Sequence, residues 1–436
     1  MKFIDLFSGI GGFHQALSNL GHDCVFASEK KEHLAKLYEL NYGITPNRNI
    51  RDVNPAEIPD HDILCAGFPC QPFSKAGNQQ GLKDENNGSF FDIIIEILRN
   101  KNPTYFILEN VRNIESHDDF KTWDYISENL SELGYNISKN VMSPHQYNIP
   151  QHRERLFIIG SLLSLNDFEW PKKVQLKNTV RNFLNGENSK LVEPERLNVI
   201  NIWQDFVSIL PKDKKLPGFP IWSMEFGATY PTNIPISELS NEELENYKGS
   251  FGVSLSGLSY EDKLKNLPGY AVKNKERKEY PIWKIRWMND NRKLFIDNKR
   301  GLTPIVKKIM KLTNKSWQKF EWNCGDVDRN INKYIIQFRA SGVRIKRADY
   351  FPSLVTVSTQ IPIIGWENRY LTPEEGAKIQ SFENITFPEN ISTCFGALGN
   401  AVNVTLVNLI ASNLLPPFEA NKEICLNEHI ELRNAL

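Results

Sequence analysis

Short hydrophobic runs alternate with helical patterns from residue 2 to about residue 160. Runs rich in β-branched and aromatic residues predict strands over 2–7, 23–29, 61–67, 104–111, 136–143 and 155–161. Apolar residues three and four positions apart predict helices over 32–40, 90–99 and 120–133. Strands that alternate with helices are typical of parallel βαβ units, so this region is expected to form one α/β domain.

The pattern becomes less regular after Trp170, where segments containing Pro and Gly, such as 216–220 and 267–270, interrupt any long element. A second, irregular domain is expected there. Near the C-terminus, Thr372 opens a Thr-Pro-Glu-Glu helix start, and 399–415 predicts a mostly apolar helix. No apolar run is expected to provide the roughly 20 residues that a membrane helix needs.

Composition places the chain among folded globular proteins. Of its 436 residues, 40% are hydrophobic and 24% are charged, which disfavours collagen-like, disordered and disulfide-scaffold proteins. Six cysteines without a CxxC pair predict the reduced thiols of a cytosolic protein and no metal site. The start of the chain lacks the pattern of a signal peptide.

The net charge is zero, so a polyanionic partner must be bound by a local basic patch. Residues 261–320 provide one candidate, with 17 Lys and Arg against 6 Asp and Glu. Trp283, Trp287 and Trp317 lie within this stretch and Trp322 lies just beyond it. Cations mixed with aromatic rings are suited to bind the phosphates and bases of a nucleic acid. The alternative is that the aromatic residues form a small hydrophobic core surrounded by solvated lysines.

A glycine-rich turn, Asp5-Leu6-Phe7-Ser8-Gly9-Ile10-Gly11-Gly12-Phe13, follows the first predicted strand and opens a helix. Such a turn lets a ligand approach the backbone. A dinucleotide fingerprint would have a third glycine where this chain has His14. Glu29, at the end of the second strand, can accept hydrogen bonds from ribose hydroxyls, so a nucleoside without a pyrophosphate fits best.

S-adenosylmethionine is such a ligand. The turn, including Ser8, Gly9, Gly11 and Gly12, could hold its amino-acid end, and Phe7 offers a ring face. Asp52 is a candidate partner for the exocyclic amine of the adenine. The alternative is that the glycine turn binds no ligand and serves only to pack the helix against the strand.

Cys70 follows the predicted strand over 61–67 in the sequence Gly67-Phe68-Pro69-Cys70-Gln71-Pro72-Phe73-Ser74. Ligands bind at the carboxyl ends of strands in open α/β sheets, and the two prolines stiffen the loop. A nucleophilic thiolate is therefore predicted at Cys70. Cys65 is expected in the core, and structural roles are preferred for Cys24, Cys324, Cys394 and Cys425.

Glu109 ends an otherwise apolar strand, where a buried carboxyl group could donate a proton. Arg153 and Arg155 are two positions apart, so on a strand both guanidinium groups would project from one face and could clamp a phosphate or a base carbonyl. Surface charges or a helix cap are the alternatives for these three residues.

In this order, the segments resemble the DNA (cytosine-5) methyltransferases of bacterial restriction-modification systems. The resemblance rests on 5–13, Glu29, 67–74, 109–111, 151–155, 369–373 and 399–402. It implies an α/β fold, with an S-adenosylmethionine-dependent methyltransferase (Rossmann-like) sheet domain and a smaller irregular target-recognition domain. The implied domains are 1–165 for catalysis and cofactor binding, 166–345 for target recognition, and 346–436 as a return segment that completes the catalytic domain.

The resemblance also implies roles for the site residues. Cys70 would add to carbon 6 of cytosine, Glu109 would engage the ring nitrogen and exocyclic amine, and Arg153 and Arg155 would fix the base carbonyl and flanking backbone. Further residues of the substrate pocket would be Phe68, Pro69 and Gln71. Asn400 would join the S-adenosylmethionine site, no metal is implied, and the target base would be flipped out of the duplex.

The implied partner is double-stranded DNA, with a cognate restriction endonuclease as a functional counterpart, in the bacterial cytoplasm at the nucleoid and without a membrane. Three other interpretations stay open: an enzyme acting on transfer RNA, a DNA-binding protein with an inactive site, and a cysteine hydrolase. The long segment between the motifs favours duplex DNA over RNA.

Overall fold

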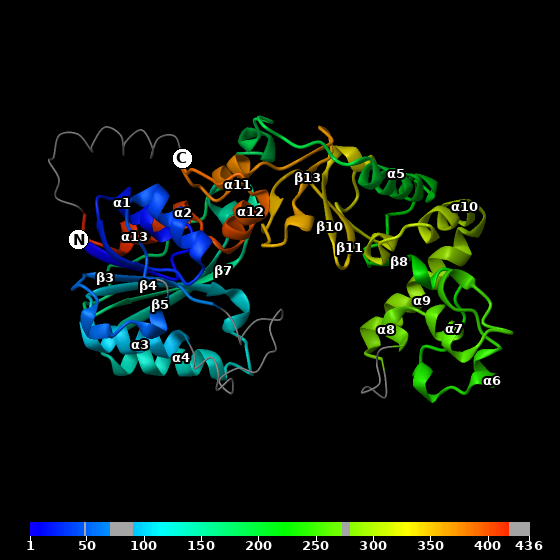
Figure 1. Cartoon of the computed structure of the whole chain (residues 1–436), viewed down its shortest axis with the longest axis horizontal. Coiled ribbons are helices and arrows are strands. Elements are labelled where there is room, and N and C mark those ends of the chain that lie inside the picture. The colour runs from blue at the N-terminus through cyan, green and yellow to red at the C-terminus, as the bar shows by residue number, and fades with distance from the viewer. Residues whose placement is uncertain (48, 70–89, 273–279, 418–436) are drawn as a thin grey trace. The chain divides into compact units, whose positions relative to one another are not determined.

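The computed structural model describes residues 1–47, 49–69, 90–272 and 280–417 (Figure 1). The chain divides into two compact units. The first unit contains residues 1–187, 349–358 and 372–436, and the second contains 188–348 and 359–371. Two segments differ from the predicted domains. Residues 166–187 belong to the first unit, and 359–371 belongs to the second unit because its two strands pair within that unit's sheet.

The described part of the first unit is built on a six-stranded sheet in the order β2-β1-β3-β4-β7-β5. Its strands are β1 (Lys2–Leu6), β2 (Asp23–Ser28), β3 (Ile63–Gly67), β4 (Tyr105–Val111), β5 (Asn136–Met142) and β7 (Arg155–Ser161). All six were predicted, with ends that differ by at most two residues.

The edge of this sheet departs from the expected all-parallel arrangement. The strands from β2 to β4 pair in parallel, whereas β7 runs antiparallel to both β4 and β5. The connection from β5 to β7 contains a short turn at Pro144–Tyr147 and the two-residue strand β6 (Gln151–His152). A parallel return needs a crossover of a dozen or more residues, usually a helix, so this shorter connection favours an antiparallel strand.

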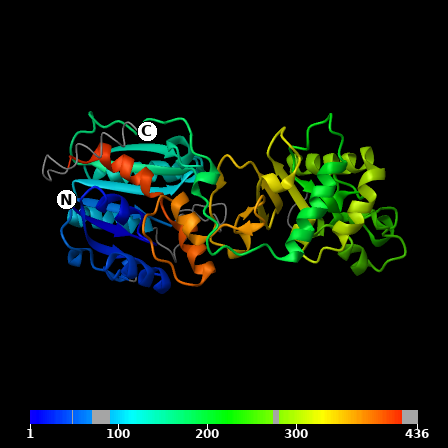
Figure 2. The same cartoon turned by 90° about the horizontal axis from the view of Figure 1, so that it is seen from above.

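Helices cover both faces of the sheet, with α3 and α4 on one face and α1, α2 and α13 on the other (Figures 1 and 2). The helices of this unit are α1 (Gly12–Ser18), α2 (Glu32–Tyr42), α3 (Phe90–Lys101), α4 (Lys121–Glu132), α11 (Pro373–Ile379), α12 (Ile391–Asn400) and α13 (Val404–Leu414). An Asn408 side-chain amide donates to Ala16 O at 3.3 Å, which ties α13 to α1. The C-terminal part of the chain therefore completes the N-terminal layer.

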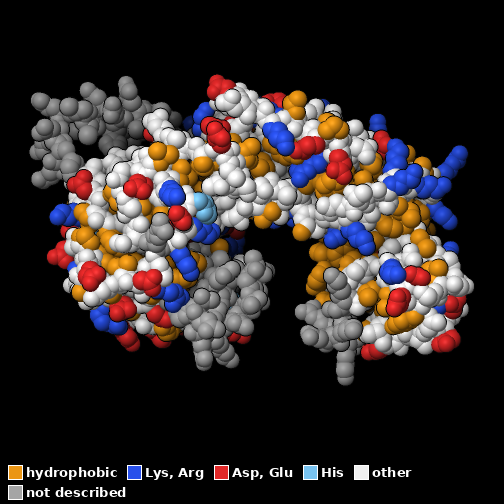
Figure 3. All heavy atoms as spheres, in the orientation of Figure 1, with side chains coloured by type: hydrophobic (Ala, Val, Ile, Leu, Met, Phe, Trp, Pro, Cys, Tyr) orange, Lys and Arg blue, Asp and Glu red, His pale blue; other side chains and the backbone are white. Residues whose placement is uncertain are grey.

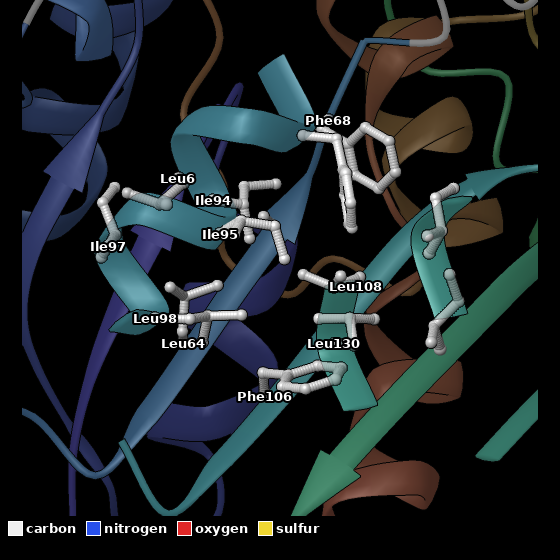
Figure 4. Close-up of a cluster of buried hydrophobic side chains, with 14 of the residues drawn as sticks. Leu6, Leu64, Phe68, Ile94, Ile95, Ile97, Leu98, Phe106, Leu108 and Leu130 are labelled. Atoms are coloured by element: carbon white, nitrogen blue, oxygen red, sulfur yellow. The ribbon is translucent and has the colours of Figure 1, made fainter. Parts of the chain in front are cut away.

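The core between the sheet and α3 combines aliphatic side chains with aromatic ones such as Phe68 and Phe106 (Figure 4). Leu64 and Leu108 from neighbouring strands lie beside Ile94 and Leu98 from α3, and all four are fully buried. These positions follow the helical and strand periodicities of the sequence, which is why the pattern predicted this layer.

Gly160 on β7 provides a stability test of this core. A Cβ atom there would lie 2.0 Å from the ring of Phe106, which is fully buried. Gly160→Ala should therefore lower the free energy of unfolding by about 1–3 kcal/mol, as overpacking does. Gly396→Ala is the control, because its nearest neighbour would lie 4.0 Å away and its helical position favours alanine. Equal thermal midpoints for the two variants would contradict this packing.

The apolar C-terminal region differs from its prediction. Residues 399–415 were expected to form one helix, but the helix ends at Asn400 and α13 begins at Val404. Asn403 caps the second helix by accepting a hydrogen bond from Leu406 N at 3.1 Å.

Among the described residues, one stretch, Ile391–Leu414, has the length and hydropathy of a membrane span, contrary to the expectation of none. Of its most apolar window, 72% is buried. The stretch is divided into helices of 10 and 11 residues, each shorter than a span requires. Its apolar character is therefore explained by burial in the first unit.

The second unit is more regular than predicted. Its described strands form a sheet in the order β14-β13-β10-β11-β9-β8. They are β8 (Ile221–Trp222), β9 (Lys319–Asn323), β10 (Ile335–Arg339), β11 (Gly342–Lys346), β13 (Ile363–Ile364) and β14 (Arg369–Tyr370). Strands of two to five residues are too short to produce a clear alternation in the sequence.

Helices and aromatic side chains complete this unit. The helices are α5 (Pro194–Ile209), α6 (Asn241–Leu244), α7 (Tyr260–Lys265), α8 (Gly269–Val272), α9 (Ile282–Asp297) and α10 (Lys299–Met310). Trp203 of α5 stacks on Phe320 of β9, with ring centroids 4.8 Å apart, and both are buried. A second cluster, around Tyr230, Leu244 and Met288, packs α6 and α9 together.

Candidate active site

The glycine-rich segment forms a tight turn between β1 and α1. Phe7, Gly9 and Gly11 have φ angles of 55°, 57° and 78°, in the left-handed region. A Cβ at Gly11 would lie 2.2 Å from the Tyr42 ring, so glycine is required there by both backbone and space. At Gly9, by contrast, a Cβ would meet nothing within 4 Å. The turn therefore presents an open backbone surface at Gly9.

Glu29 lies directly against this turn. Its Oε2 accepts a hydrogen bond from Gly9 N at 3.0 Å, and its Oε1 accepts one from Lys31 N at 2.8 Å. Ser8 N donates to Ser28 O at 2.9 Å, which joins the turn to the end of β2. The acid and the turn predicted from spacing thus form one feature, with a carboxylate beside an open backbone.

An aromatic contact brings the Asp52 segment to the same turn. The Phe7 and Phe90 rings meet edge to face at 5.2 Å, and the Arg51 guanidinium lies 4.4 Å from the Phe90 centroid. Asp52, the next residue, accepts a hydrogen bond from the Asn49 side chain at 2.8 Å. Sequence reasoning missed Phe90, which was recognised only as a helix residue.

A buried aromatic cluster supports the turn from behind. His14 stacks on Tyr42 at 4.0 Å, and a 2.6 Å hydrogen bond joins His14 Nδ1 to the Tyr38 hydroxyl. Burial lowers the pKa of His14 to about 4, so the ring is neutral near pH 7. Burial also raises the pKa of Asp5 well above its usual range. The residue that breaks the dinucleotide fingerprint is therefore part of the packing.

The return segment contacts the turn through Gly12, where a Cβ would lie 2.5 Å from Val402. Asn400, at the end of α12, lines a pocket of about 420 Å³. The other residues around this pocket are Lys31, His33, Leu34, Thr356, Ser392, Thr393 and Gly396. Lys31 is also the residue whose amide donates to Glu29, so the pocket adjoins the acidic end of β2.

Glu29→Ala should weaken cofactor binding more than turnover. The hydrogen bonds predicted between the Glu29 carboxylate and ribose hydroxyls would be lost, so the dissociation constant for S-adenosylmethionine should rise at least about tenfold. Titration calorimetry measures this directly. Glu39→Ala, which removes an exposed carboxylate bonded to Thr45, is the control and should leave binding unchanged. Unaltered binding in the Glu29 variant would exclude this role.

Phe68 and Pro69 follow the end of β3 and directly precede Cys70 in the sequence. Phe68 is buried, and its carbonyl accepts a hydrogen bond from the Asn110 side chain at 3.2 Å. Pro69 is exposed, while Cys70 and Gln71 lie outside the described residues. Asn110 is itself buried and accepts a bond from Val111 N at 2.8 Å. It therefore positions the segment that leads to Cys70, a role that the sequence analysis did not assign.

Glu109 lies beside the same strand end. It is paired with Gly67 across β3 and β4, and a Cβ at Gly67 would be 3.8 Å from Glu109 Oε2. Arg155 Nε lies 2.8 Å from Glu109 Oε1, and both side chains are largely buried. Arg155 also donates to Glu154 O at 2.8 Å. The structure thus brings a carboxylate and a guanidinium together next to the segment that leads to Cys70.

Arg153 does not pair with Glu109 as Arg155 does. Its guanidinium donates to Gly399 O at 3.1 Å and to Ala401 O at 2.9 Å, and the residue is buried. Burial, with Arg155 nearby, lowers its pKa to about 9. The prediction that both arginines project from one strand face is wrong, because Arg153 precedes β7 and the period-two alternation does not apply. Arg153 instead fastens the return segment.

The remaining cysteines fit structural roles. Cys65, Cys324 and Cys394 are buried, and Cys24 is partly buried with a pKa raised by burial to about 12. Cys425 lies outside the described residues. No cluster of three or more metal-ligating side chains occurs within the described ranges.

Comparison with known proteins identifies the family. The family described as C-5 cytosine-specific DNA methylase matches residues 1–415. The chain belongs to this family. It is 39% identical over 220 residues to the type II methyltransferase M.HhaI of Haemophilus parahaemolyticus, covering 50% of this chain and 67% of that protein. It is 38% identical over 226 residues to M.NgoBI of Neisseria gonorrhoeae, covering 52% and 69%.

Solved structures show the methyltransferase fold. A putative DNA modification methyltransferase encoded within an E. coli prophage superposes with a TM-score of 0.52 at 17% identity, over 95% of this chain and 98% of that one. The S. pombe Dnmt2 methyltransferase gives 0.50 at 18% identity, over 96% and 100%. The chain is thus a DNA cytosine-5 methyltransferase of the restriction-modification type, a family whose methyl donor is S-adenosylmethionine.

Proposed function

We propose that this methyltransferase modifies carbon 5 of cytosine within a specific double-stranded DNA sequence, through a covalent bond between Cys70 and a base flipped out of the duplex. The observation that carries the proposal is the Glu109–Arg155 pair at the strand end that leads to Cys70. Open α/β sheets bind their ligands at this end of the strands.

The turn and its acid fit an S-adenosylmethionine molecule. Gly9 leaves space at the backbone, and the Glu29 carboxylate lies against the turn, with its Oε2 bonded to Gly9 N. When bound, the molecule supplies the methyl group. The residues that would hold it are Phe7, Ser8, Gly9, Gly11, Gly12, Glu29, Asp52 and Asn400.

The chain's own residues would prepare the cytosine. The Cys70 thiolate forms a bond to carbon 6, and the electron pair released in the ring makes carbon 5 nucleophilic. Glu109 engages the ring nitrogen and exocyclic amine, so negative charge does not build up on the base. After methyl uptake, loss of the carbon 5 proton breaks the sulfur–carbon bond and frees Cys70.

The arginines would serve different purposes. Arg155 orients the Glu109 carboxylate and reaches the base carbonyl, while Arg153 keeps the segment around Asn400 in place. Phe68, Pro69 and Gln71 would line the base pocket. Because Cys70 must attack carbon 6 from a face of the ring, and neighbouring base pairs cover both faces in a duplex, the base must leave the helix first.

The second unit would recognise the DNA target. It contains the basic stretch, and Lys299, Arg300, Lys307 and Lys311 of α10 and its end are exposed. Figure 3 shows Lys and Arg side chains gathered over α10. Such cations suit phosphates, which position a protein on DNA without reading its sequence.

In the cell, this activity would protect host DNA from a cognate restriction endonuclease, in the cytoplasm at the nucleoid. The named type II relatives support this role. Neither the partner enzyme nor a membrane is needed for the reaction itself.

The test is transfer of labelled methyl groups from S-adenosylmethionine to unmethylated duplex DNA and to transfer RNA. We expect incorporation into DNA only, and bisulfite sequencing of DNA from expressing cells should reveal one protected sequence context. Incorporation into transfer RNA would favour the RNA-modifying interpretation. Specific DNA binding without incorporation would indicate an inactive site, and activity without S-adenosylmethionine would indicate a hydrolase.

A further inference from the structure

An exposed indole marks the start of α9. Trp283 exposes 52% of its surface and the preceding Ile282 exposes 86%. In Figure 3, hydrophobic side chains gather on the surface over α8 and α9. A group of exposed large apolar side chains indicates a binding surface more often than a lone residue does.

This indole belongs to an ordered set of rings, which we name the aromatic platform: Trp222, Tyr270, Trp283 and Trp287. Trp283 meets Trp287 at 4.7 Å, Trp287 meets Trp222 at 5.6 Å, and Trp222 meets Tyr270 at 5.0 Å between centroids. The rings come from β8, α8 and α9. Contacts among the three elements hold Trp287 in place, and Trp283 packs on Trp287.

A buried charge anchors the platform from below. Glu225 is fully buried and accepts hydrogen bonds from the hydroxyls of Tyr270 and Tyr230. Arg292 Nε lies 2.8 Å from the same carboxylate, and its Nη1 donates to Tyr230 O at 2.8 Å. These buried hydrogen bonds fix the Tyr270 ring, which is the member of the platform that they contact.

Cations border the platform. Lys284 Nζ lies 4.7 Å from the Tyr270 centroid and 5.0 Å from that of Tyr280. The Arg286 side chain is 80% exposed, with Asp290 3.8 Å away. Positive charge next to an exposed ring complements a polyanion that carries aromatic bases.

The other tryptophans of the basic stretch have structural positions. Trp322 is buried, and Trp317 packs edge to face on Phe338 at 5.5 Å. Of the four tryptophans in or next to this stretch, Trp322 is therefore buried, Trp287 and Trp317 are partly buried, and Trp283 is exposed.

We propose that Trp283 is a specificity-determining contact that packs its indole against base edges in a groove of double-stranded DNA, while Arg286 neutralises a neighbouring phosphate. The proposal rests on the proposed function of the second unit. Phosphate contacts add affinity for any sequence, whereas contacts to bases distinguish sequences.

The test compares a duplex carrying the site found by bisulfite sequencing with a scrambled duplex, at several salt concentrations. Trp283→Ala should raise the dissociation constant for the site about tenfold, as loss of a base-edge contact does. The salt slope and the affinity for the scrambled duplex should stay unchanged. Arg286→Ala should weaken binding to both duplexes and reduce the salt slope by about one.

Matched variants separate this contact from a structural role. Ile296→Ala removes a side chain of the same helix that is 69% exposed and should leave both affinities unchanged. Trp283→Phe should restore part of the affinity for the site. The thermal midpoint and S-adenosylmethionine affinity of Trp283→Ala should match the wild type, because the ring is half exposed.

Two results distinguish the failures. If the wild type transfers no methyl group to DNA, the proposed function is wrong. If the wild type is active and Trp283→Ala binds the site like the wild type, changes only self-association, or alters the salt slope, the base contact is overturned.

Discussion

Replacement of Cys70 by serine should reduce methyl transfer at least about a thousandfold while S-adenosylmethionine and DNA still bind. A serine hydroxyl is almost entirely protonated at neutral pH, whereas a thiol supplies a reactive thiolate fraction. Loss of the nucleophile alone commonly removes most of an enzyme's catalytic power. Single-turnover methyl transfer with saturating substrates measures the effect on chemistry.

Cys394→Ser is the matched control. Its thiol donates to Pro388 O and Asn390 O, both at 3.2 Å, and a hydroxyl can make the same bonds. This variant should keep wild-type turnover. Retained turnover in the Cys70 variant would mean that another group attacks the base.

Glu109→Gln should lower turnover by about a hundredfold to ten-thousandfold, with little change in cofactor affinity. The amide has nearly the shape of the carboxyl group but cannot transfer a proton to the ring nitrogen, so this variant removes general acid catalysis. It also replaces the carboxylate 2.8 Å from Arg155 Nε by a neutral group. Rapid-quench measurement of the methyl-transfer step separates this loss from slow product release.

Glu115→Gln is a suitable comparison, because Glu115 forms a more exposed ion pair with Lys139 at 2.8 Å. Its turnover should equal that of the wild type. A Glu109 variant with a normal single-turnover rate but weaker DNA binding would show that the carboxylate only binds the base.

Most elements of the first unit could be predicted because its sheet and helices obey simple periodicities, although α12 was missed. Leu64 and Leu108 alternate with neighbours on parallel strands, and Ile94 and Leu98 are four positions apart on α3. The position of Glu29 beside the glycine turn could also be predicted, because neighbouring parallel strands end at the same edge of a sheet.

Other features depend on contacts between distant segments and were missed. Arg153 binds carbonyls near residue 400, and Asn110 binds the carbonyl of Phe68, partners that no local pattern reveals. The antiparallel direction of β7 follows from the short connection between β5 and β7, which contains no α-helix. The sequence pattern did not show how this segment folds. In the second unit, the strands are too short for the sequence pattern to predict the sheet. Composition alone did not distinguish the buried Trp322 from the exposed Trp283.

Covalent trapping tests the central claim most directly. Duplex DNA with 5-fluorocytosine at the target position cannot lose the group at carbon 5 after methyl uptake, so the sulfur–carbon bond should persist. We predict a denaturation-resistant protein–DNA adduct that forms only with S-adenosylmethionine present, with the modified peptide containing Cys70, and none with Cys70→Ser. Methylation of ordinary DNA without any adduct on the fluorinated duplex, or an adduct on another residue, would contradict the account.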